Sequence, residues 1–447
     1  MSRIARLEFN LNGSLPCGDA DHNGYNEVYG DSHYVMVAFE CRENNQFHRL
    51  AVEPVIATGG FWEFGDGDCD NKMDLVALPP GGLTGIVESP DSESFPADSV
   101  WGEPPDNRQG GSYCYPLFTD LDQDGRKELA IRTAGNGVWL YENCGDNSYY
   151  LAAKLTNHAP NGYFGVFDAG DFDRDGLMEL VVGAAWESVV YLFEATGYDN
   201  DYVLSAVCTT ATEQNRNAAG VSDMDHDGWP EFVVVGLDTT GGMRVMVFEA
   251  TGHAQYRMTW DQLRFDMDPG LLENPISSGD VDGDGIVDFA VNSGTGHLIL
   301  YKSNGLHSYI QAWIFDSVGV YERLFDINRD GRAEVLFDGP QGTEVWEDTE
   351  GLAVAEMAKP RLESRVSAVP TVLRLGATPL FSGIPTDAAV EIHGVDGRLV
   401  RRQPQVRQPS WTWDLRDQAG NFVPAGTYFA VIRSKGKSTS LKLCLVK

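Results

Sequence analysis

Short apolar runs recur along the first part of the chain, separated by polar segments. Runs of about four to six residues, rich in β-branched and aromatic side chains, occur at residues 179–185, 231–236 and 288–291. A second apolar run follows each of them, and then a more polar one, as at residues 189–194 and 202–208. Runs this short predict buried strands. With the strand before each polar loop, the pattern predicts four strands in a repeat of about 50 residues, the size of a propeller blade.

An acidic loop of nine residues stands at the start of these apolar runs, with the pattern D-x-[DN]-x-[DN]-G-x-x-[DE]. It occurs seven times, with starts 47, 54, 51, 52, 57 and 46 residues apart. Seven copies in phase predict a repeat architecture with a bound cation in each repeat. The side chains at positions 1, 3, 5 and 9 are Asp19, Asp21, Asn23 and Glu27; Asp66, Asp68, Asp70 and Asp74; Asp120, Asp122, Asp124 and Glu128; Asp171, Asp173, Asp175 and Glu179; Asp223, Asp225, Asp227 and Glu231; Asp280, Asp282, Asp284 and Asp288; and Asp326, Asn328, Asp330 and Glu334.

The fourth loop shows why this pattern suits a hard cation. Ca²⁺ takes six to eight oxygen ligands at roughly 2.3–2.6 Å. Asp171, Asp173 and Asp175 can point three carboxylates inward from one tight turn, and Gly176 accepts the positive φ that reverses the chain. The carbonyl of position 7 and the carboxylate of Glu179 would complete the shell. Carboxylates this close repel one another unless a divalent charge lies between them, so we expect about seven structural Ca²⁺ ions per chain.

Three loops depart from the pattern. Asn23 in the first loop and Asn328 in the seventh offer an oxygen without a charge, so these two sites should bind calcium more weakly. The second loop has Asn71 at the glycine position, and Asn is the residue that tolerates the left-handed conformation next best. Position 12, which is a bidentate Glu in an EF-hand, falls in an apolar run here, so the loops are not EF-hands.

Residues 163–185, with the fourth loop at their centre, resemble the FG-GAP repeat, also called the VCBS or integrin-α-like repeat. The resemblance covers residues 1–358 and is best in the third to sixth repeats. It implies an all-β fold, a seven-bladed β-propeller with calcium in the loop that joins the first two strands of each blade. It also implies that ligands bind on the face opposite these loops.

Two segments compete to close the predicted ring. Residues 4–9 look like the outer strand of a blade and could complete the last one, which would leave no open sheet edge. Residues 352–358 are the alternative. We expect the N-terminal segment to close the ring.

Charge separates the chain into two parts. Residues 1–360 carry 60 acids and 20 Lys plus Arg, a formal charge of −40, which makes nucleic acid an unsuitable partner. No apolar run is long enough to span a membrane. We expect an exported protein, because calcium loops of this kind suit the calcium concentrations found outside the cytosol. Residues 1–14 contain no apolar signal segment, so we expect the leader to be missing from this sequence. The seven cysteines show neither metal spacing nor an assignable disulfide framework.

The C-terminal part reverses the charge, because residues 361–447 carry 13 Lys plus Arg against 6 acids. Short strands around an Asp-Gly turn at residues 396–397 and a Pro-Ala-Gly turn at 424–426 predict a small β-sandwich at 371–447, after a linker at 359–370. This tail resembles the FlgD-like immunoglobulin fold and the C-terminal sorting domain of type IX secretion. The resemblance implies contact with secretion machinery; the alternative is an inert spacer.

Two classes of function remain open. One is a secreted or cell-surface binding module for glycans or proteins, which we favour; the other is a polysaccharide-lyase-like enzyme. Nucleophile, zinc and phosphate-loop motifs are absent from the sequence, and we expect the acidic loops to be structural rather than catalytic. A ligand site on the opposite face would draw on the loop residues Arg108, Arg132, His158, Tyr163, Trp186, Arg216, His297 and Tyr321. A lyase would need a base beside an arginine, and His158 or Tyr163 near Arg132 or Arg216 would favour that function.

Overall fold

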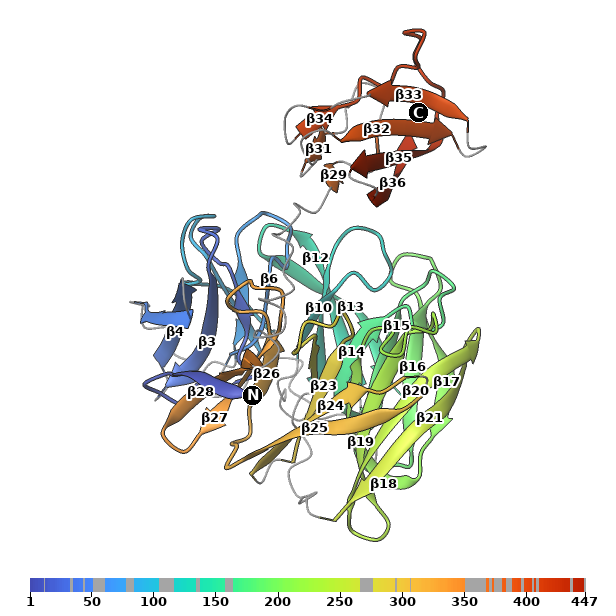
Figure 1. Ribbon diagram of the computed structural model, residues 1–447. Helices are drawn as coiled ribbons and strands as arrows, with labels where there is room; N and C mark the ends of the chain where they lie inside the picture. The colour runs from blue at the N-terminus through green and yellow to red at the C-terminus, as the bar shows by residue number, and fades with distance from the viewer. Residues whose placement is uncertain are drawn as a thin grey trace. The chain divides into compact units, whose positions relative to one another are not determined.

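The structure is a computed structural model. It describes all residues except 12, 33–34, 43–44, 51–60, 78–83, 104–115, 134–136, 157–163, 266–275, 294–295, 306, 350–366, 370–371, 374–379, 383–387, 395–397, 404–405, 407–409, 435–436 and 446–447. The chain divides into two compact units, Met1–Gly351 and Leu352–Lys447 (Figure 1).

The described part of the first unit contains seven four-stranded antiparallel sheets. The first sheet consists of β2 (Cys17–Gly18), β3 (Asn26–Ser32), β4 (Val35–Arg42) and β5 (Gln46–Arg49). The second consists of β6 (Phe61–Gly65), β7 (Asp74–Ala77), β8 (Gly85–Glu88) and β9 (Asp98–Gly102). The third consists of β10 (Leu117–Thr119), β11 (Glu128–Thr133), β12 (Gly137–Gly145) and β13 (Ser148–Thr156).

The remaining four sheets repeat this order. The fourth consists of β14 (Phe164–Gly170), β15 (Glu179–Ala184), β16 (Val189–Ala195) and β17 (Tyr202–Thr209). The fifth consists of β18 (Thr212–Gly220), β19 (Glu231–Asp238), β20 (Met243–Gly252) and β21 (Gln255–Arg264). The sixth consists of β22 (Ser277–Gly279), β23 (Asp288–Asn292), β24 (His297–Ser303) and β25 (Tyr309–Asp316). The seventh consists of β26 (Glu322–Phe325), β27 (Glu334–Gly339), β28 (Gly342–Glu347) and β1 (Ser2–Arg6).

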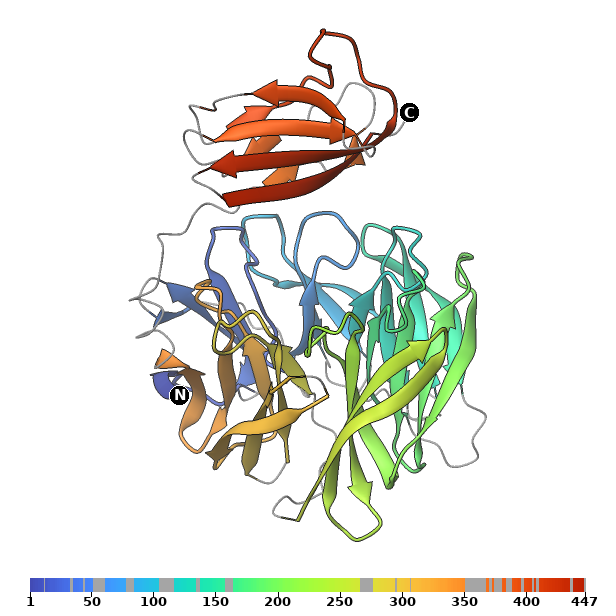
Figure 2. The ribbon, with the colours of Figure 1, turned by 45° about the vertical axis from the view of Figure 1, so that its right-hand side comes forward.

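The sheets pack against one another through apolar clusters, one between each neighbouring pair. Val181 of the fourth sheet, for example, shares a cluster with Phe232 of the fifth. Leu336 of the seventh sheet shares one with Val28 of the first. The other five pairs of consecutive sheets are joined in the same way. The sheets therefore form a closed ring (Figures 1 and 2), which confirms the all-β propeller class.

This packing explains the apolar runs in the sequence. The second and third strands of each sheet lie in the middle of the ring wall and contact sheets on both sides. All six residues of β15 are buried, and so are six of the seven residues of β16. A strand covered on both faces needs a continuous apolar run rather than an alternating one. The fourth strands are more polar because their outer edges face solvent, as in β17.

The N-terminal strand closes the ring. β1 pairs antiparallel with β28, with Ser2 opposite Glu347 and Arg6 opposite Glu344, and forms the fourth strand of the seventh sheet. The N–H of Leu7 extends the pairing by donating to the Thr343 carbonyl at 2.8 Å. The structure therefore confirms the N-terminal closure. The competing segment at residues 352–358 lies outside the described residues.

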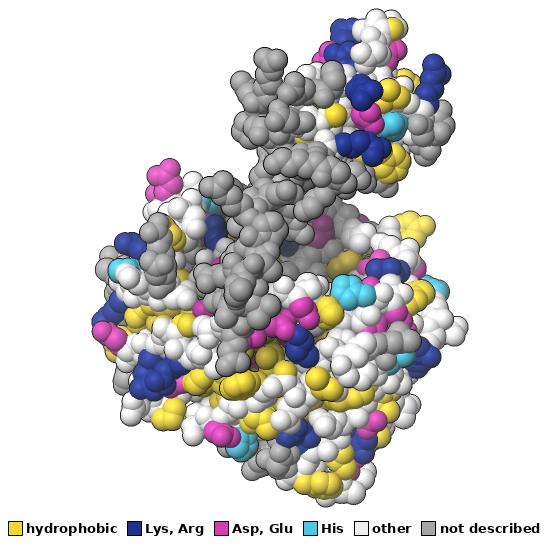
Figure 3. Space-filling view, viewed as in Figure 1, with side chains coloured by type: hydrophobic (Ala, Val, Ile, Leu, Met, Phe, Trp, Pro, Cys, Tyr) yellow, Lys and Arg dark blue, Asp and Glu magenta, His cyan; other side chains and the backbone are white. Residues whose placement is uncertain are grey.

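The outer strands of the fourth to sixth sheets carry several exposed apolar side chains. Val207 of β17, Met258 of β21 and Trp313 of β25 are between 39% and 50% exposed. Figure 3 shows hydrophobic side chains spread across this side of the first unit, with charged side chains among them. No helix in the described parts of the chain has the length and apolar character needed to cross a bilayer.

The second unit is a small sandwich of two sheets. One sheet has the order β29 (Ser367–Val369), β31 (Leu380–Ser382), β34 (Ser410–Thr412). The other has the order β30 (Val372–Leu373), β36 (Lys437–Leu445), β35 (Gly426–Ser434), β32 (Ala389–Gly394), β33 (Leu399–Gln403). Both sheets contribute to one apolar core around the fully buried Trp413. β29 lies within the segment predicted as a linker, so the described part of this unit begins before residue 371. Its likeness to immunoglobulin and sorting domains stays a prediction.

Candidate metal centres

All seven acidic loops occupy the same place, between the first and second strands of a sheet. The fourth loop, for example, leaves β14 after Gly170 and enters β15 at Glu179. The resemblance to FG-GAP repeats implied this placement for calcium. Since the ring brings the sheets together in chain order, each loop also lies next to the loops and hairpins of its neighbours.

The loop backbone is fixed by hydrogen bonds from its own N–H groups. In the fourth loop the N–H of Gly176 donates to Asp171 Oδ2 at 3.2 Å, and the N–H of Leu177 donates to Asp175 Oδ1 at 2.8 Å. The equivalent two bonds are present in the other six loops. The side-chain oxygens at positions 1 and 5 are therefore held in place by the main chain.

Two positions in each loop adopt positive φ. Gly176 has a φ of 95°, and Asn71, which replaces glycine in the second loop, has a φ of 70°. Position 4 also has positive φ in every loop, although only the sixth loop has glycine there, and Arg174 with a φ of 60° is an example. The glycine at position 6 predicted the positive φ there, whereas the positive φ at position 4 was not predicted from the sequence.

The acid at position 9 is buried in every loop, where it is at most 1% exposed. Glu179 is 0% exposed, and its Oε2 accepts the N–H of Phe172 at 2.7 Å. Its other oxygen, Oε1, is buried without a hydrogen-bond partner. The same arrangement of one bonded and one unpartnered oxygen occurs at Glu27, Asp74, Glu231 and Asp288. In the remaining two loops, a second donor reaches the acid: Tyr202 bonds Glu128, and Asn328 bonds Glu334.

Buried carboxylates of this kind fit a cation. Position 1 adds further unpartnered buried oxygens, at Asp19, Asp171 and Asp223. Leaving a charged oxygen buried without a partner is costly, whereas a metal ion would supply the missing contact. The donors available are carboxylate, amide and carbonyl oxygens, the set that Ca²⁺ prefers. These residues would hold the ion, which would supply the positive charge that the loop lacks.

The pKa values of the buried loop acids also indicate that the loops need a cation. Burial, together with the nearby carboxylates of Asp173 and Asp171, raises the pKa of Glu179 to about 8. Burial likewise raises the pKa of Glu334 to about 9 and of Asp288 to about 7. A divalent ion at such a carboxylate favours the ionised form and opposes the effect of burial.

A second ring of acids, which the sequence analysis missed, lies on the third strands. Glu194 of β16 is directly opposite Glu179 of β15 in the strand register. Like charges directly opposite one another destabilise a sheet unless something neutralises them. The equivalent acids are Glu40, Glu88, Glu142, Glu249 and Glu347, all at most 6% exposed like Glu194, while the sixth sheet has Lys302 at this place. The signal in the sequence was a single Glu at the end of the third-strand run in six of the seven sheets.

Hairpins of the following sheet cover several loops. In these hairpins, the turn between the third and fourth strands of one sheet donates a backbone N–H to the acid at position 3 in the loop of the preceding sheet. Asn147 bonds Asp68 at 2.7 Å, and Ala254 bonds Asp173 at 2.6 Å. Asn200 and His307 bond Asp122 and Asp225 in the same way. The loops therefore connect consecutive sheets as well as consecutive strands.

The residues predicted for the opposite face have varied positions. Arg108, His158 and Tyr163 lie outside the described residues, and Arg216 belongs to β18 but its side chain is not described. Trp186, in the turn between β15 and β16, is 50% exposed. His297 of β24 contacts Asp316 at 2.9 Å.

Of the other two described candidates, one is buried and one is partly buried. Arg132 of β11 is 4% exposed and donates to the Phe164 carbonyl at 3.3 Å, so it links the third and fourth sheets. Tyr321 packs against the apolar cluster between the seventh and first sheets. Of the described candidates, Trp186 therefore offers the most exposed surface.

The chain shows one match to a known family. A family model described as FG-GAP-like repeat matches residues 120–182, from the start of the third loop into β15. No curated protein matches the chain in a sequence comparison.

Three solved structures illustrate the structural similarity. BBS1N in complex with ARL6DN, soaked with lead, is 11% identical with a TM-score of 0.50, over 77% of this chain and 95% of that one. Sqt1 of Saccharomyces cerevisiae is 12% identical with a TM-score of 0.47, over 78% and 99%. PorZ, a surface component of the type-IX secretion system of Porphyromonas gingivalis, is 12% identical with a TM-score of 0.35, over 94% and 64%. The likeness to BBS1N supports the fold of the first unit.

Proposed function

We propose that this protein is a calcium-stabilised surface or secreted propeller that binds a glycan or protein ligand. The observation that carries the calcium part is the sevenfold loop whose position 9 holds a buried acid. In five loops that acid keeps one oxygen without a partner. The FG-GAP-like match over the third and fourth loops supports this proposal.

Calcium acts here as a part of the fold. An ion that binds only the folded loops stabilises them by mass action, and each loop joins two strands and contacts the next sheet. Chelation should therefore lower the melting temperature markedly, and added Ca²⁺ should restore it. Mg²⁺ should restore less, because it demands a smaller octahedral shell. An identical melting temperature in chelator and in calcium would refute the stabilising role.

The ligand face is proposed on the side opposite the loops. The turns between second and third strands lie there, and one of them presents Trp186. Aromatic rings stack on the faces of sugars. A glycan array in calcium buffer, with Trp186→Ala beside the native protein, tests this. Binding that the variant loses supports a glycan ligand; an array without any binder points to a protein ligand instead.

A lyase remains the runner-up function. It requires a base close to an arginine that neutralises the substrate carboxylate. Arg132, one of the two arginines considered for that role, is buried between two sheets. A lyase assay on acidic polysaccharides decides between the two functions, because release of unsaturated sugars would overturn the non-catalytic assignment.

We further propose that the second unit serves export. It is a separate compact unit with its own core, and the first unit carries loops suited to calcium concentrations found outside the cytosol. Cell fractionation of a strain that expresses the protein tests this. Recovery on the surface or in the medium supports the proposal, and recovery in the cytosol alone would overturn it.

A further inference from the structure

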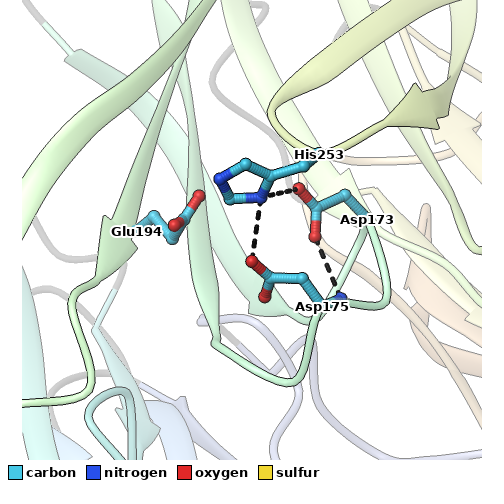
Figure 4. A group of neighbouring side chains, drawn as sticks. All are labelled: Asp173, Asp175, Glu194 and His253. Carbon is cyan, nitrogen blue, oxygen red and sulfur yellow. Dashed lines mark hydrogen bonds and ion pairs between the residues drawn. The ribbon is translucent and has the colours of Figure 1, made fainter.

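Each acidic loop has an outer side as well as an inner one. On the outer side, the acids at positions 3 and 5 face the acid of the third strand. We call these three residues, with whatever hairpin residue approaches them, the outer cluster of a sheet. In the fourth sheet it consists of Asp173, Asp175, Glu194 and His253 (Figure 4).

In five other sheets a Lys or Arg neutralises the outer cluster. Lys72 contacts Glu88 at 3.0 Å, Arg126 contacts Glu142 at 3.1 Å, and Arg257 contacts Glu249 at 3.5 Å. Arg42 pairs with Glu40, and Lys302 contacts Asp282 and Asp284. In the seventh sheet, Asn45 Nδ2 donates to Glu347 Oε2 at 3.1 Å.

The fourth sheet differs from the five sheets that have a Lys or Arg there. Among the described residues, no Lys or Arg makes an ion pair with its outer cluster. Position 7 of the loop, where the third loop has Arg126, is Leu177, and the residue opposite Glu194 is Val203, where the fifth sheet has Arg257 opposite Glu249. Within the part of the chain that the structure describes, these three carboxylates therefore have no Lys or Arg as a partner.

A histidine occupies the place instead. His253, at the β20–β21 hairpin of the next sheet, has Nδ1 3.2 Å from Asp173 Oδ2 and 2.8 Å from Asp175 Oδ2. Glu194 points its carboxylate toward the same space (Figure 4). It is 6% exposed, and its Oε2 is buried without a hydrogen-bond partner. One ligand atom from each of the four residues lies within 4.8 Å of the others.

We propose that the fourth sheet holds a second metal site, for a divalent transition-metal ion of the Zn²⁺, Co²⁺ or Mn²⁺ class, with the ligands Asp173, Asp175, Glu194 and His253. The imidazole nitrogen decides the class, since Ca²⁺ and Mg²⁺ select oxygen ligands whereas imidazole suits transition metals. Each aspartate has two oxygens, so one can face the loop ion and the other the outer ion. The site thus goes beyond the calcium proposal and does not depend on which ion fills the loop.

Two variants remove the site in different ways, and a third is the matched control. His253→Ala deletes the nitrogen ligand. Val203→Arg, at a residue 45% exposed, places a guanidinium opposite Glu194 as Arg257 stands opposite Glu249 in the fifth sheet. His307→Ala is the control: His307 lies at the same place over the fifth loop and is close to Asp225 and Asp227, but there Arg257 pairs with Glu249.

The probe is Co²⁺, added to full-length protein in saturating Ca²⁺ and followed by its visible absorption and by titration calorimetry. We expect about one tight Co²⁺ per chain in the native protein and in His307→Ala, and about tenfold or more weaker binding in the other two variants. Native-like melting in calcium shows that a variant is folded. Equal Co²⁺ affinity in His253→Ala and in the native protein, or equal loss in His307→Ala, would overturn the site. Calcium stoichiometry, measured separately, shows whether the calcium proposal holds.

Discussion

Replacing Glu179 by Gln should have opposite consequences with and without calcium. The side chain is 0% exposed, Oε2 accepts the Phe172 N–H, and Oε1 is unpartnered. Gln keeps the shape and the acceptor but removes the charge. The change should therefore relieve the cost of a buried carboxyl when calcium is absent and remove a ligand when calcium is present.

The sizes of the two effects follow from the pKa and from mass action. Burial raises the pKa of Glu179 from 4.5 to about 8. Because the pKa is higher in the folded state than in the unfolded state, the free energy of unfolding falls as the pH rises from 4.5 toward about 8. At pH 7 this cost is at most about 3 kcal/mol, and Gln removes it. At a free Ca²⁺ concentration 10 to 100 times the dissociation constant, one site contributes about 1.4 to 2.7 kcal/mol to the free energy of unfolding. The variant should lose most of this contribution.

The assay is the melting temperature at pH 7 in chelator and in excess Ca²⁺. Calcium should raise the melting temperature of Glu179→Gln by a few degrees less than that of the native protein. Glu322→Gln is the matched control: Glu322 is buried, has a pKa raised to about 8 by burial, and belongs to no loop. It should gain stability in both buffers and keep the full calcium shift. A native calcium shift in Glu179→Gln would refute the assignment of Glu179 as a ligand.

Three further predictions concern the loops and the ring. Asp173→Ala should lower the melting temperature in calcium more than Asp122→Asn does, because only the first change removes a ligand oxygen; calorimetry giving the reverse order would contradict the assigned ligand positions. Gly176→Ala, at a φ of 95°, should cost about 1–2 kcal/mol, whereas Asn71→Gly, at a φ of 70°, should gain up to about 1 kcal/mol in denaturant unfolding. Deleting residues 1–6 should expose the edge of β28, lower the melting temperature and cause aggregation visible by light scattering; an unchanged monomer would show that β1 is dispensable for closure.

The sequence predicted the loops well because their determinants are local. Nine contiguous residues contain the four acidic or amide side chains and the glycine, so the whole motif can be recognised within one short segment. The apolar runs at β15 and β19 followed directly from burial on both faces. The N-terminal closure could be predicted because residues 4–9 have the pattern of a strand, and the sequence suggested no other strand with which they would pair.

The features that the sequence did not predict depend on contacts between distant segments. Glu194 reads as an ordinary last residue of a strand, and only the register of β15 with β16 places it opposite Glu179. The N–H of Ala254 reaches Asp173 across 81 residues because two sheets are neighbours in the ring. Arg132 looked like an exposed loop residue, yet its guanidinium lies between two sheets.

The central claim, that the sevenfold loop is a calcium site, can be tested most directly by counting the ions. Protein freed of metal by chelation is titrated with Ca²⁺ by calorimetry, and the saturated protein is analysed for bound metal after removal of free ions. The account predicts about seven Ca²⁺ per chain, with the loops that contain Asn23 and Asn328 among the last to fill. Fewer than about four Ca²⁺ per chain at saturation would contradict it.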